Sequence, residues 1–306
     1  MRCIVTGATS FLGRVLINRL LKDGHHVVAV CRHGALSIET LPVGVEVILA
    51  DMNEYGDLYH AVSQADVWVN LAWGGTGHSG RDSEEIQQTN VIYSTAAMSC
   101  ADKMGCRLFV ETGSQAEYGI VNTVIQEATP CHPFSAYGKA KLKVKERLTE
   151  LSATLGIKYL HLRIFSLIGE GDHPWTLVMS CIDRMLRHAP IQLSSCTQYW
   201  NFLYVGDAAE QIVRLCEYAL SNDDFTHDVF NIASDDTRPL KNFVDEMYHL
   251  TASHSQLLYG AIPQQHVVSL QPDITKLRQT IGLVSTTPFA DVIQRIIHTL
   301  YNDKGK

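Results

Sequence analysis

The sequence predicts an α/β fold, a doubly wound parallel sheet with a smaller C-terminal lobe. Short apolar stretches alternate with helical stretches through the first half of the chain, the order that a parallel sheet covered by helices requires. A glycine-bearing loop separates the first apolar stretch from the first helical one, and after Phe165 the alternation gives way to a Gly- and Pro-bearing loop. We therefore expect a Rossmann-type dinucleotide-binding domain at 1–165, with 200–235 returning to it, and a substrate-binding lobe made of 166–199 and 236–306.

Bulk composition narrows the classes of protein. The 306-residue chain has a net charge of −7 and no basic block, which argues against nucleic acid or an anionic membrane surface as a partner. Its eight cysteines are scattered without a Cys-x-x-Cys pair, as in reduced cytoplasmic proteins. We see no signal peptide and no apolar run of membrane-spanning length, and the fourteen histidines have no metal-binding spacing. We expect a cytoplasmic protein without a metal site.

The first element is a strand at 3–6, followed by a loop from Gly7 to Gly13 and a helix at 15–22. This order is the context that a dinucleotide-binding fingerprint requires, because the glycines let the backbone approach a pyrophosphate and the helix offers free N–H groups. Ser10 replaces the middle glycine, and a small side chain can still fit there. The alternative is a tight turn without a ligand. The residues expected to contact the cofactor are Gly7, Thr9, Ser10, Phe11, Leu12 and Gly13.

The tip of the second strand bears on the choice of cofactor. The strand at 27–30 ends at Cys31, Arg32 and His33. In NAD-binding proteins an Asp or Glu usually stands at this tip and binds the 2′-hydroxyl of the ribose. Arg32 would instead attract a 2′-phosphate, so the sequence favours NADP, with NAD as the alternative if Arg32 is only a solvated charge.

The next strands lead toward the centre of the sheet. A strand at 45–50 ends at Asp51 and Met52, which we expect at the adenine edge of the cofactor. A helix at 53–64 and a strand at 67–71 follow. The loop 73–82 then holds four glycines together with His78 and Arg81. This loop lies at the strand edge where a substrate would bind, or it is an inert flexible turn.

The next strand is followed by a serine, and the helix after it carries a tyrosine and a lysine near its start. After a helix at 83–104 comes a strand at 107–112, and Ser114 lies just past its carboxyl end, where parallel sheets bind ligands. Tyr137 and Lys141 stand four residues apart in a helix that we expect at 135–155, so they share one face. A nearby ammonium favours the phenolate, which makes Tyr137 a candidate proton donor and acceptor.

The rest of the chain is predicted to contain one more strand of the main sheet and several helices. A strand at 158–165 completes the first domain, and a strand at 229–233 returns to its sheet. The helices are expected at 177–188, 207–220, 241–250 and 289–301.

At this point the sequence resembles the extended short-chain dehydrogenase/reductases, the family of NAD(P)-dependent nucleotide-sugar epimerases, dehydratases and reductases. The resemblance runs through nearly the whole chain in the family's order. It rests on TGATSFLG at 6–13, NLAW at 70–73, TNV at 89–91, GSQAEYG at 113–119, SAYGKAK at 135–141, LRIFS at 162–166, NFLYVGD at 201–207, FNI at 230–232 and DITK at 273–276.

The resemblance implies specific roles. Tyr137 would exchange the proton of the sugar hydroxyl or ketone, Lys141 would hold the nicotinamide ribose and tune Tyr137, and Ser114 would hydrogen-bond the reacting oxygen. Asn90 matches the family's structural asparagine. Further cofactor contacts are implied for Leu71, Ala72, Trp73, Asn90, Tyr137, Lys141 and Ile164.

The departures from the family pattern narrow the chemistry. The 4,6-dehydratases carry an acidic pair directly after the serine, whereas this chain has Gln115 and Ala116, with Glu117 one step too late. Cys131 and His132 do not match the extra catalytic pair of the C3/C5 epimerases, so we interpret them as loop residues. Two residues that usually grip the substrate diphosphate, an Asn and an Arg, are replaced by Ser166 and Trp200. The expected substrate contacts are Ser114, Gln115, Ala116, Ser166, Trp175 and Trp200, although large aromatic residues at a lobe interface are more often core.

Three functions are compatible with these residues. The first is a 4-ketoreductase that reduces a nucleotide-linked 4-keto-sugar with NADPH. The second is a nucleotide-sugar 4-epimerase, which needs the same three residues and usually retains NAD. The third is a regulator that binds NADP and has lost catalysis, against which the intact Ser-Tyr-Lys set argues. The resemblance also implies a homodimer formed by the helices at 84–104 and 135–155.

Overall fold

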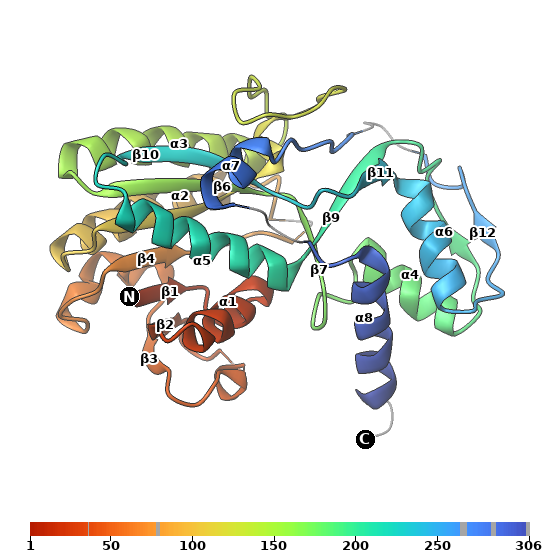
Figure 1. The fold of residues 1–306 in the computed structure, drawn as a ribbon, viewed down its shortest axis with the longest axis horizontal. Helices are drawn as coiled ribbons and strands as arrows, with labels where there is room; N and C mark the ends of the chain where they lie inside the picture. The colour runs from red at the N-terminus through yellow and green to blue at the C-terminus, as the bar shows by residue number, and fades with distance from the viewer. Residues whose placement is uncertain (36, 78–79, 264–267, 283–285, 304–306) are drawn as a thin grey trace.

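The computed structural model describes the 306-residue chain apart from residues 36, 78–79, 264–267, 283–285 and 304–306 (Figure 1). Its centre is a seven-stranded parallel sheet with the strand order β10-β6-β5-β4-β1-β2-β3. This order confirms the doubly wound sheet, and β10 beside β6 confirms the returning strand. The strands are β1 (Arg2–Thr6), β2 (His26–Cys31), β3 (Glu46–Leu49), β4 (Val67–Asn70), β5 (Leu108–Ser114), β6 (Lys158–Ile164) and β10 (His227–Ile232).

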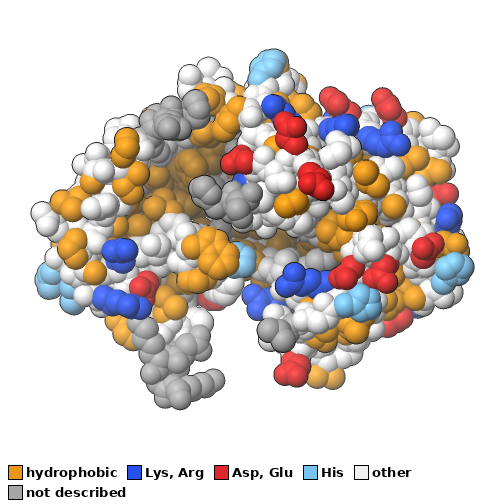
Figure 2. Space-filling view, turned by 180° about the vertical axis from the view of Figure 1, so that it is seen from behind, with side chains coloured by type: hydrophobic (Ala, Val, Ile, Leu, Met, Phe, Trp, Pro, Cys, Tyr) orange, Lys and Arg blue, Asp and Glu red, His pale blue; other side chains and the backbone are white. Residues whose placement is uncertain are grey.

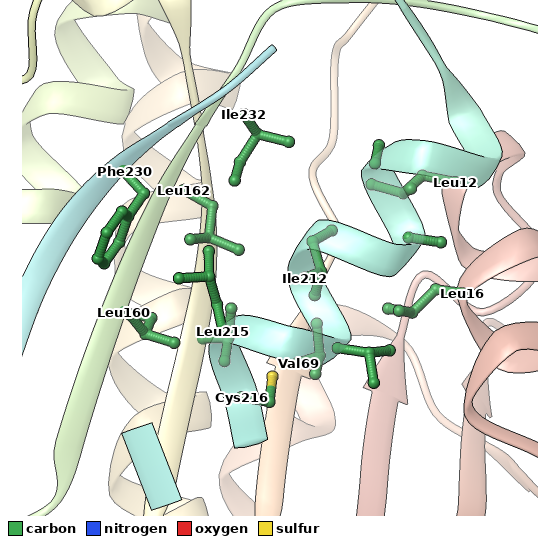
Figure 3. Close-up of a cluster of buried hydrophobic side chains, with 14 of the residues drawn as sticks. Leu12, Leu16, Val69, Leu160, Leu162, Ile212, Leu215, Cys216, Phe230 and Ile232 are labelled. Atoms are coloured by element: carbon green, nitrogen blue, oxygen red, sulfur yellow. The ribbon is translucent and has the colours of Figure 1, made fainter. Parts of the chain in front are cut away.

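Helices cover both faces of the sheet, because the strands are apolar on both sides. In β1, Cys3 and Val5 belong to one buried cluster and Ile4 to another, as the two-residue period of a strand requires. Helices α1 (Phe11–Lys22) and α5 (Val205–Ser221) pack on the first face (Figure 3). Helices α2 (Glu84–Lys103) and α3 (Ala136–Leu155) pack together on the second face (Figure 1).

Capping residues set the ends of α2 and α3. The side chains of Ser83 and Ser135 accept hydrogen bonds from the first-turn N–H groups of Ile86 and Gly138. These bonds satisfy donors that a helix leaves unpaired. Helix α3 ends at Gly156, whose φ of 73° is left-handed and suits glycine. The predicted start and end of this helix are thus confirmed.

The predicted helix at 53–64 is a 3₁₀ helix instead, η2 (Met52–His60). Only Tyr55 and Leu58 are buried in it, and their three-residue spacing matches the three residues per turn of a 3₁₀ helix. Val62, four residues after Leu58, is buried in the same cluster, but it lies beyond the end of this 3₁₀ helix.

A smaller lobe with its own buried cluster follows the sheet. It contains a three-stranded sheet, β7 (Ser166–Ile168), β9 (Tyr199–Tyr204) and β11 (Thr237–Pro239), and the short pair β8 (Ile191–Gln192) and β12 (Leu257–Leu258). The sequence predicted none of these five strands. The helices of the lobe are α4 (Leu177–Leu186), α6 (Leu240–Leu250) and α8 (Phe289–Asp303).

Part of the expected lobe packs on the main sheet. Helix α7 (Thr275–Ile281) contacts α5 and β10, and Leu270, Ile274 and Leu277 belong to the buried cluster on the α5 face. The expected 236–306 segment therefore crosses from the lobe to the sheet and back, so the domain division stays a proposal.

All eight cysteines are free thiols, and seven of them are buried. Cys131 is half-buried. Within the described ranges, none of the helices is both long and apolar enough to pass through a bilayer.

Candidate active site

The structure brings Ser114, Tyr137 and Lys141 together where β5 ends and α3 begins. Tyr137 and Lys141 lie on one face of α3, with the Lys141 Nζ 5.9 Å from the centre of the Tyr137 ring. The Ser114 side chain lies close enough to the phenol of Tyr137 to lower its pKa. A hydroxyl, a phenol and an ammonium thus converge at the carboxyl edge of the sheet, the usual ligand edge of such folds.

Lys141 is buried and surrounded on several sides. Its Nζ donates to the Thr112 carbonyl at 2.6 Å, lies 3.4 Å from the centre of the Trp73 ring, and is 3.7 Å from Glu111 Oε1. Burial lowers the pKa of Lys141 to about 8, although the Glu111 carboxylate opposes this change. Burial also raises the pKa of Glu111 to about 7, against the pull of Lys141 and of an Asn70 amide 2.7 Å away. The ammonium and the carboxylate therefore titrate close to physiological pH.

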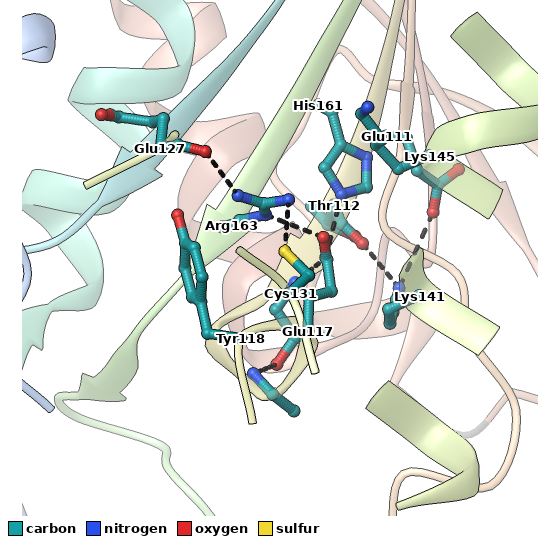
Figure 4. A network of polar contacts seen from close by, with 12 residues as sticks. Glu111, Thr112, Glu117, Tyr118, Glu127, Cys131, Lys141, Lys145, His161 and Arg163 are labelled. Carbon is teal, nitrogen blue, oxygen red and sulfur yellow. Dashed lines mark hydrogen bonds and ion pairs between the residues drawn. The ribbon is translucent and has the colours of Figure 1, made fainter. Parts of the chain in front are cut away.

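Glu117 holds the Ser114 turn in place. Ser114 caps the short helix η3 (Gln115–Glu117), and Glu117 Oε1 accepts the Ser114 backbone N–H at 2.8 Å. The other donors to this carboxylate come from β6: His161 Nε2 at 2.9 Å and Arg163 Nε at 2.8 Å (Figure 4). All four residues are buried, so one carboxylate ties the end of β5 to the neighbouring strand.

The charges in this cluster follow from its contacts. Burial alone would raise the pKa of Glu117, but its contacts with His161 and with the Arg163 guanidinium outweigh this effect and lower the pKa to about 2. Burial lowers the pKa of His161, so its imidazole is neutral at neutral pH. We assign its proton to Nε2, which then donates to Glu117, while Nδ1 accepts from the Tyr159 hydroxyl at 2.9 Å. Arg163 is the cation that keeps Glu117 ionised.

The glycine-rich loop after β4 is fixed by two side chains of α2. Gln87 is buried; its Nε2 donates to the carbonyls of Gly75 and Gly80 at 3.1 and 2.9 Å, and its Oε1 accepts the Trp73 indole N–H at 2.8 Å. Asn90 donates to the Gly74 carbonyl and accepts the Gly74 N–H, at 2.9 and 2.8 Å. Both ends of the Asn90 amide thus hydrogen-bond Gly74, which supports the structural role that the resemblance implies; its contact with a cofactor stays a prediction.

The same loop places Arg81 against Tyr137. The guanidinium carbon lies 4.1 Å from the centre of the Tyr137 ring, and the Arg81 carbonyl accepts the Tyr137 N–H at 3.0 Å. The loop therefore contacts Tyr137 through both its backbone and a side chain. His78 lies outside the described residues.

The first glycine loop fits a dinucleotide. Gly7 has a φ of +64°, and a Cβ there would lie 2.9 Å from the Ala72 N atom, so the loop packs directly against the end of β4. A Cβ on Gly13 would lie 2.3 Å from the Gly7 carbonyl oxygen. Ser10 caps α1 by accepting the Gly13 N–H at 3.0 Å, so its proton remains available to a ligand. Thr9 and the exposed Ser10 border the helix N-terminus, where a pyrophosphate binds in such loops.

The tips of β2 and β3 carry both signs of charge. Cys31 is buried in the core, so its thiol is not offered to a ribose, whereas Arg32 is exposed. Glu54 Oε2 accepts the Asp51 N–H at 2.7 Å and contacts His33 Nε2 at 3.0 Å. The exposed ligand atoms of His33, Asp51 and Glu54 lie within 4.8 Å of one another.

The expected substrate residues divide into two groups. Ser166 and Trp200 line one cavity of about 210 Å³. Trp175 is 72% exposed, stacks on His173 at 4.4 Å, and borders a larger cavity of about 700 Å³ in the lobe. Figure 2 shows the molecule hollowed near the centre of this view, with hydrophobic side chains inside the hollow.

The other residues singled out in the sequence are half-buried or buried. Gln115 and Ala116 are half-buried in η3, and Cys131 accepts a hydrogen bond from Arg163 at 3.1 Å. Phe11, Met52, Leu71 and Ile164 are partly buried, and Leu12 and Ala72 are buried.

Sequence reasoning missed Glu111, the role of Glu117, His161, Arg163 and Gln87. A signal was present, because three of these charged or polar residues interrupt apolar strands: Glu111 in β5, and His161 and Arg163 two residues apart in β6. Residues two apart face the same side of a strand. Polar groups at buried positions require partners, so such interruptions point to a network.

Known proteins share this arrangement of motifs. Residues 3–233 match the model of the "NAD dependent epimerase/dehydratase family". The dTDP-6-deoxy-L-talose 4-dehydrogenase (NAD(+)) of Aggregatibacter actinomycetemcomitans is 25% identical over 258 residues, which cover 80% of this chain and 89% of that protein. The UDP-glucose 4-epimerase of Corynebacterium glutamicum is 24% identical over 268 residues, with coverage of 82% and 80%.

Among solved structures, the UDP-glucose 4-epimerase of Thermotoga maritima with UDP-glucose matches with a TM-score of 0.87 at 19% identity. The match covers 99% of this chain and 100% of that one, and at this identity it is a likeness of fold. The family model spans well over half of the sequence. The chain therefore belongs to the NAD-dependent epimerase/dehydratase family, the extended short-chain dehydrogenase/reductases that its motifs resemble.

Proposed function

We propose that this protein transfers hydride at C4 of a nucleotide-linked sugar, as a reductase of a nucleoside-diphosphate 4-keto-(deoxy)hexose. The observation that carries the proposal is the convergence of Ser114, Tyr137 and Lys141 at the carboxyl edge of the sheet, beside a glycine loop that fits a dinucleotide. A bound nicotinamide cofactor supplies or accepts the hydride.

Each of the three residues has a distinct part in this proposal. Tyr137 gives a proton to the C4 oxygen on reduction and takes it back on oxidation. Ser114 hydrogen-bonds the same oxygen and the phenol, and so fixes their separation. Lys141 binds the ribose next to the nicotinamide, and its charge favours the phenolate. Loop 7–13 and the N-terminus of α1 would hold the pyrophosphate.

The buried state of Glu117 argues against a dehydratase. Eliminating water requires an acid that can reach the sugar, and Gln115 and Ala116 supply none. Glu117 accepts three hydrogen bonds from the protein and is buried. Its carboxylate is therefore committed to the protein rather than to a substrate.

A 4-epimerase is the second candidate. It needs the same three residues, and two of the similar proteins described above are named UDP-glucose 4-epimerases. The similar 4-dehydrogenase, which is matched over 89% of its length, supports net oxidation or reduction at C4. A third possibility, a regulator without catalysis, would be excluded by turnover that depends on Tyr137.

For the cofactor we propose NADP, with NAD as the second candidate. Arg32 is exposed, and within the described part of the chain its side chain has no ion pair, so a 2′-phosphate could bind it in a bidentate manner. The nearby carboxylates of Asp51 and Glu54, by contrast, are engaged with His33 and with backbone N–H groups. NAD would be favoured if these carboxylates instead accepted a 2′-hydroxyl.

The proposal is tested with a panel of nucleotide sugars and their 4-keto derivatives, each incubated with NADPH or NADH and followed by mass spectrometry. A reductase converts only 4-keto substrates and consumes the reduced cofactor. An epimerase interconverts two sugars without net cofactor consumption. If no member of the panel shows turnover that depends on Tyr137, as tested with Tyr137→Phe, both the reductase and the epimerase are contradicted. We further propose that the active form is a cytoplasmic homodimer.

A further inference from the structure

A second cation lies closer to Tyr137 than Lys141 does. The guanidinium carbon of Arg81 is 4.1 Å from the centre of the Tyr137 ring, whereas the Lys141 Nζ is 5.9 Å away. The Lys141 ammonium is also directed elsewhere, toward the Thr112 carbonyl and the face of Trp73. Arg81 is half-buried, and within the described part of the chain its guanidinium has no carboxylate partner.

The position of Arg81 is built into the fold. The Arg81 carbonyl accepts the N–H of Tyr137 in the first turn of α3, a donor that the helix itself leaves unpaired. Gln87 fixes the preceding glycines, Gly75 and Gly80, which pack so closely that a Cβ on Gly80 would lie 2.4 Å from the Gly75 Cα. These main-chain contacts do not depend on the Arg81 side chain, so a substitution at Arg81 leaves them in place.

The charged groups around Tyr137 act in opposite directions. Burial raises the pKa of Tyr137, Arg81 is the principal charge that opposes this rise, and the Ser114 side chain adds to its effect. Glu117 from η3 and Glu111 from β5 act the other way. Lys141, on the same helix, has a pKa of about 8 and so loses its charge in mildly alkaline solution. A guanidinium stays charged at every pH at which proteins are folded.

We propose that Arg81 is a positioning residue of the active site, whose guanidinium over the Tyr137 ring stabilises the phenolate in addition to Lys141. This inference rests on the proposed role of Tyr137 as proton donor and acceptor. It assigns to the glycine-rich loop an electrostatic task in addition to its place at the substrate edge. It also means that the phenolate keeps a cationic neighbour when Lys141 becomes neutral.

The test compares wild type with Arg81→Gln, Arg81→Lys and the control Lys139→Gln. Lys139 is exposed on α3, two residues from Tyr137, and its replacement removes one positive charge without touching the phenol. The first measurement needs no sugar: tyrosinate absorbance is titrated against pH for each protein and for its Tyr137→Phe counterpart, and the difference reports Tyr137 alone. The second is the pH profile of turnover on the active substrate.

We expect Arg81→Gln to move the Tyr137 titration upward by about one to three pH units, the usual effect of a charge within 4–6 Å. The acidic limb of the oxidation rate should move with it, so that the rate at a fixed pH below this limb falls at least about tenfold. Arg81→Lys should keep the Tyr137 titration close to that of wild type, because the positive charge is retained. Lys139→Gln should match wild type.

Equal Tyr137 titrations in wild type and Arg81→Gln would overturn the inference. An equally large shift in Arg81→Lys would also overturn it, since packing rather than charge would then be responsible. Because the titration uses no substrate, its result stands even if the panel of nucleotide sugars reveals a different reaction.

Discussion

Replacing Glu117 with glutamine should destabilise this protein far more than the small change in shape suggests. Glutamine has almost the same volume as glutamate but no charge, and one of its two acceptor oxygens becomes a donor. The buried carboxylate accepts from the Ser114 N–H, His161 and Arg163 at 2.8–2.9 Å. In Glu117→Gln, Arg163 becomes a buried cation without a carboxylate, and one of the three donors faces the new NH₂ group.

The magnitude follows from the burial of all partners. The Glu117 and His161 side chains are 0% exposed and that of Arg163 is 4% exposed. Breaking such a buried pair costs about 3–5 kcal/mol, because the remaining charge keeps its desolvation penalty. The lost Ser114 contact overlaps with this figure and is not added to it. For a domain of this size, roughly 2–4 °C per kcal/mol gives a fall in Tm of roughly 6–20 °C.

The control is Glu46→Gln. Glu46 also pairs with an arginine, Arg2, at 2.8 Å, but these side chains are 50% and 40% exposed. Surface pairs of this kind contribute less than about 1 kcal/mol. Urea titration and thermal unfolding of wild type, Glu117→Gln and Glu46→Gln, monitored by circular dichroism, provide the comparison.

A similar loss of unfolding free energy in Glu117→Gln and Glu46→Gln would refute the reasoning. The two ion pairs have equal N···O distances, so their burial would then make no difference. A loss below about 1 kcal/mol in Glu117→Gln would also refute it, since the Arg163 charge would have found another partner.

Four further outcomes are expected. Tyr137→Phe should lower turnover by about a hundred- to ten-thousand-fold with cofactor affinity changed only a few-fold, because the ring keeps its place without its proton; full activity would show that another group supplies the proton. Glu111→Gln should move the alkaline limb of turnover to lower pH, because loss of the anion 3.7 Å from Lys141 lowers the lysine pKa below its value of about 8; an unmoved limb would count against the pair. Arg32→Ala should weaken NADPH binding about ten- to a hundred-fold in fluorescence titrations and leave NADH binding nearly unchanged, and equal effects on both would return Arg32 to a solvated charge. Light scattering should give a dimer mass at micromolar concentration, and Ile92→Glu on α2, where Ile92 is 57% exposed, should shift it toward the monomer; a wild-type monomer would remove the basis for this interface.

Acid should unfold the protein through the Glu117 cluster. The folded-state pKa of His161 lies below its ordinary value of 6.5, so the unfolded chain binds the proton first and stability falls as the pH drops below about 6.5. Glu117 titrates at about 2 in the folded state and 4.5 in its ordinary state, so its contribution is complete above 4.5 and is lost toward 2. The curves of unfolding free energy against pH for wild type and Glu117→Gln should therefore converge as the pH falls from 4.5 toward 2. A wild-type curve that stays flat across this range would contradict the assignment.

The sequence by itself determined the sheet and the positions of the three candidate residues. Strands that are apolar on both faces can only be buried between helices, so a parallel sheet covered by helices on both faces followed from the alternation of apolar and helical stretches. The spacing of Tyr137 and Lys141 placed both on one helix face, and Ser135 and Gly156 marked its ends, because these are local consequences of helix geometry and capping.

Only the tertiary structure decided which groups meet across elements. Arg81 and Tyr137 are 56 positions apart, and Glu117 and His161 are 44 apart; nothing local in the sequence specifies that a loop carbonyl meets a helix N-terminus or that two strands share one carboxylate. Cys31, which the sequence placed at the cofactor, is buried because β2 continues through it, and its side chain joins Val27 and Ala29 in the cluster on one face of the sheet. Spacing along the chain thus determined the local geometry, and packing determined the electrostatic environment in which Tyr137 and Lys141 would act.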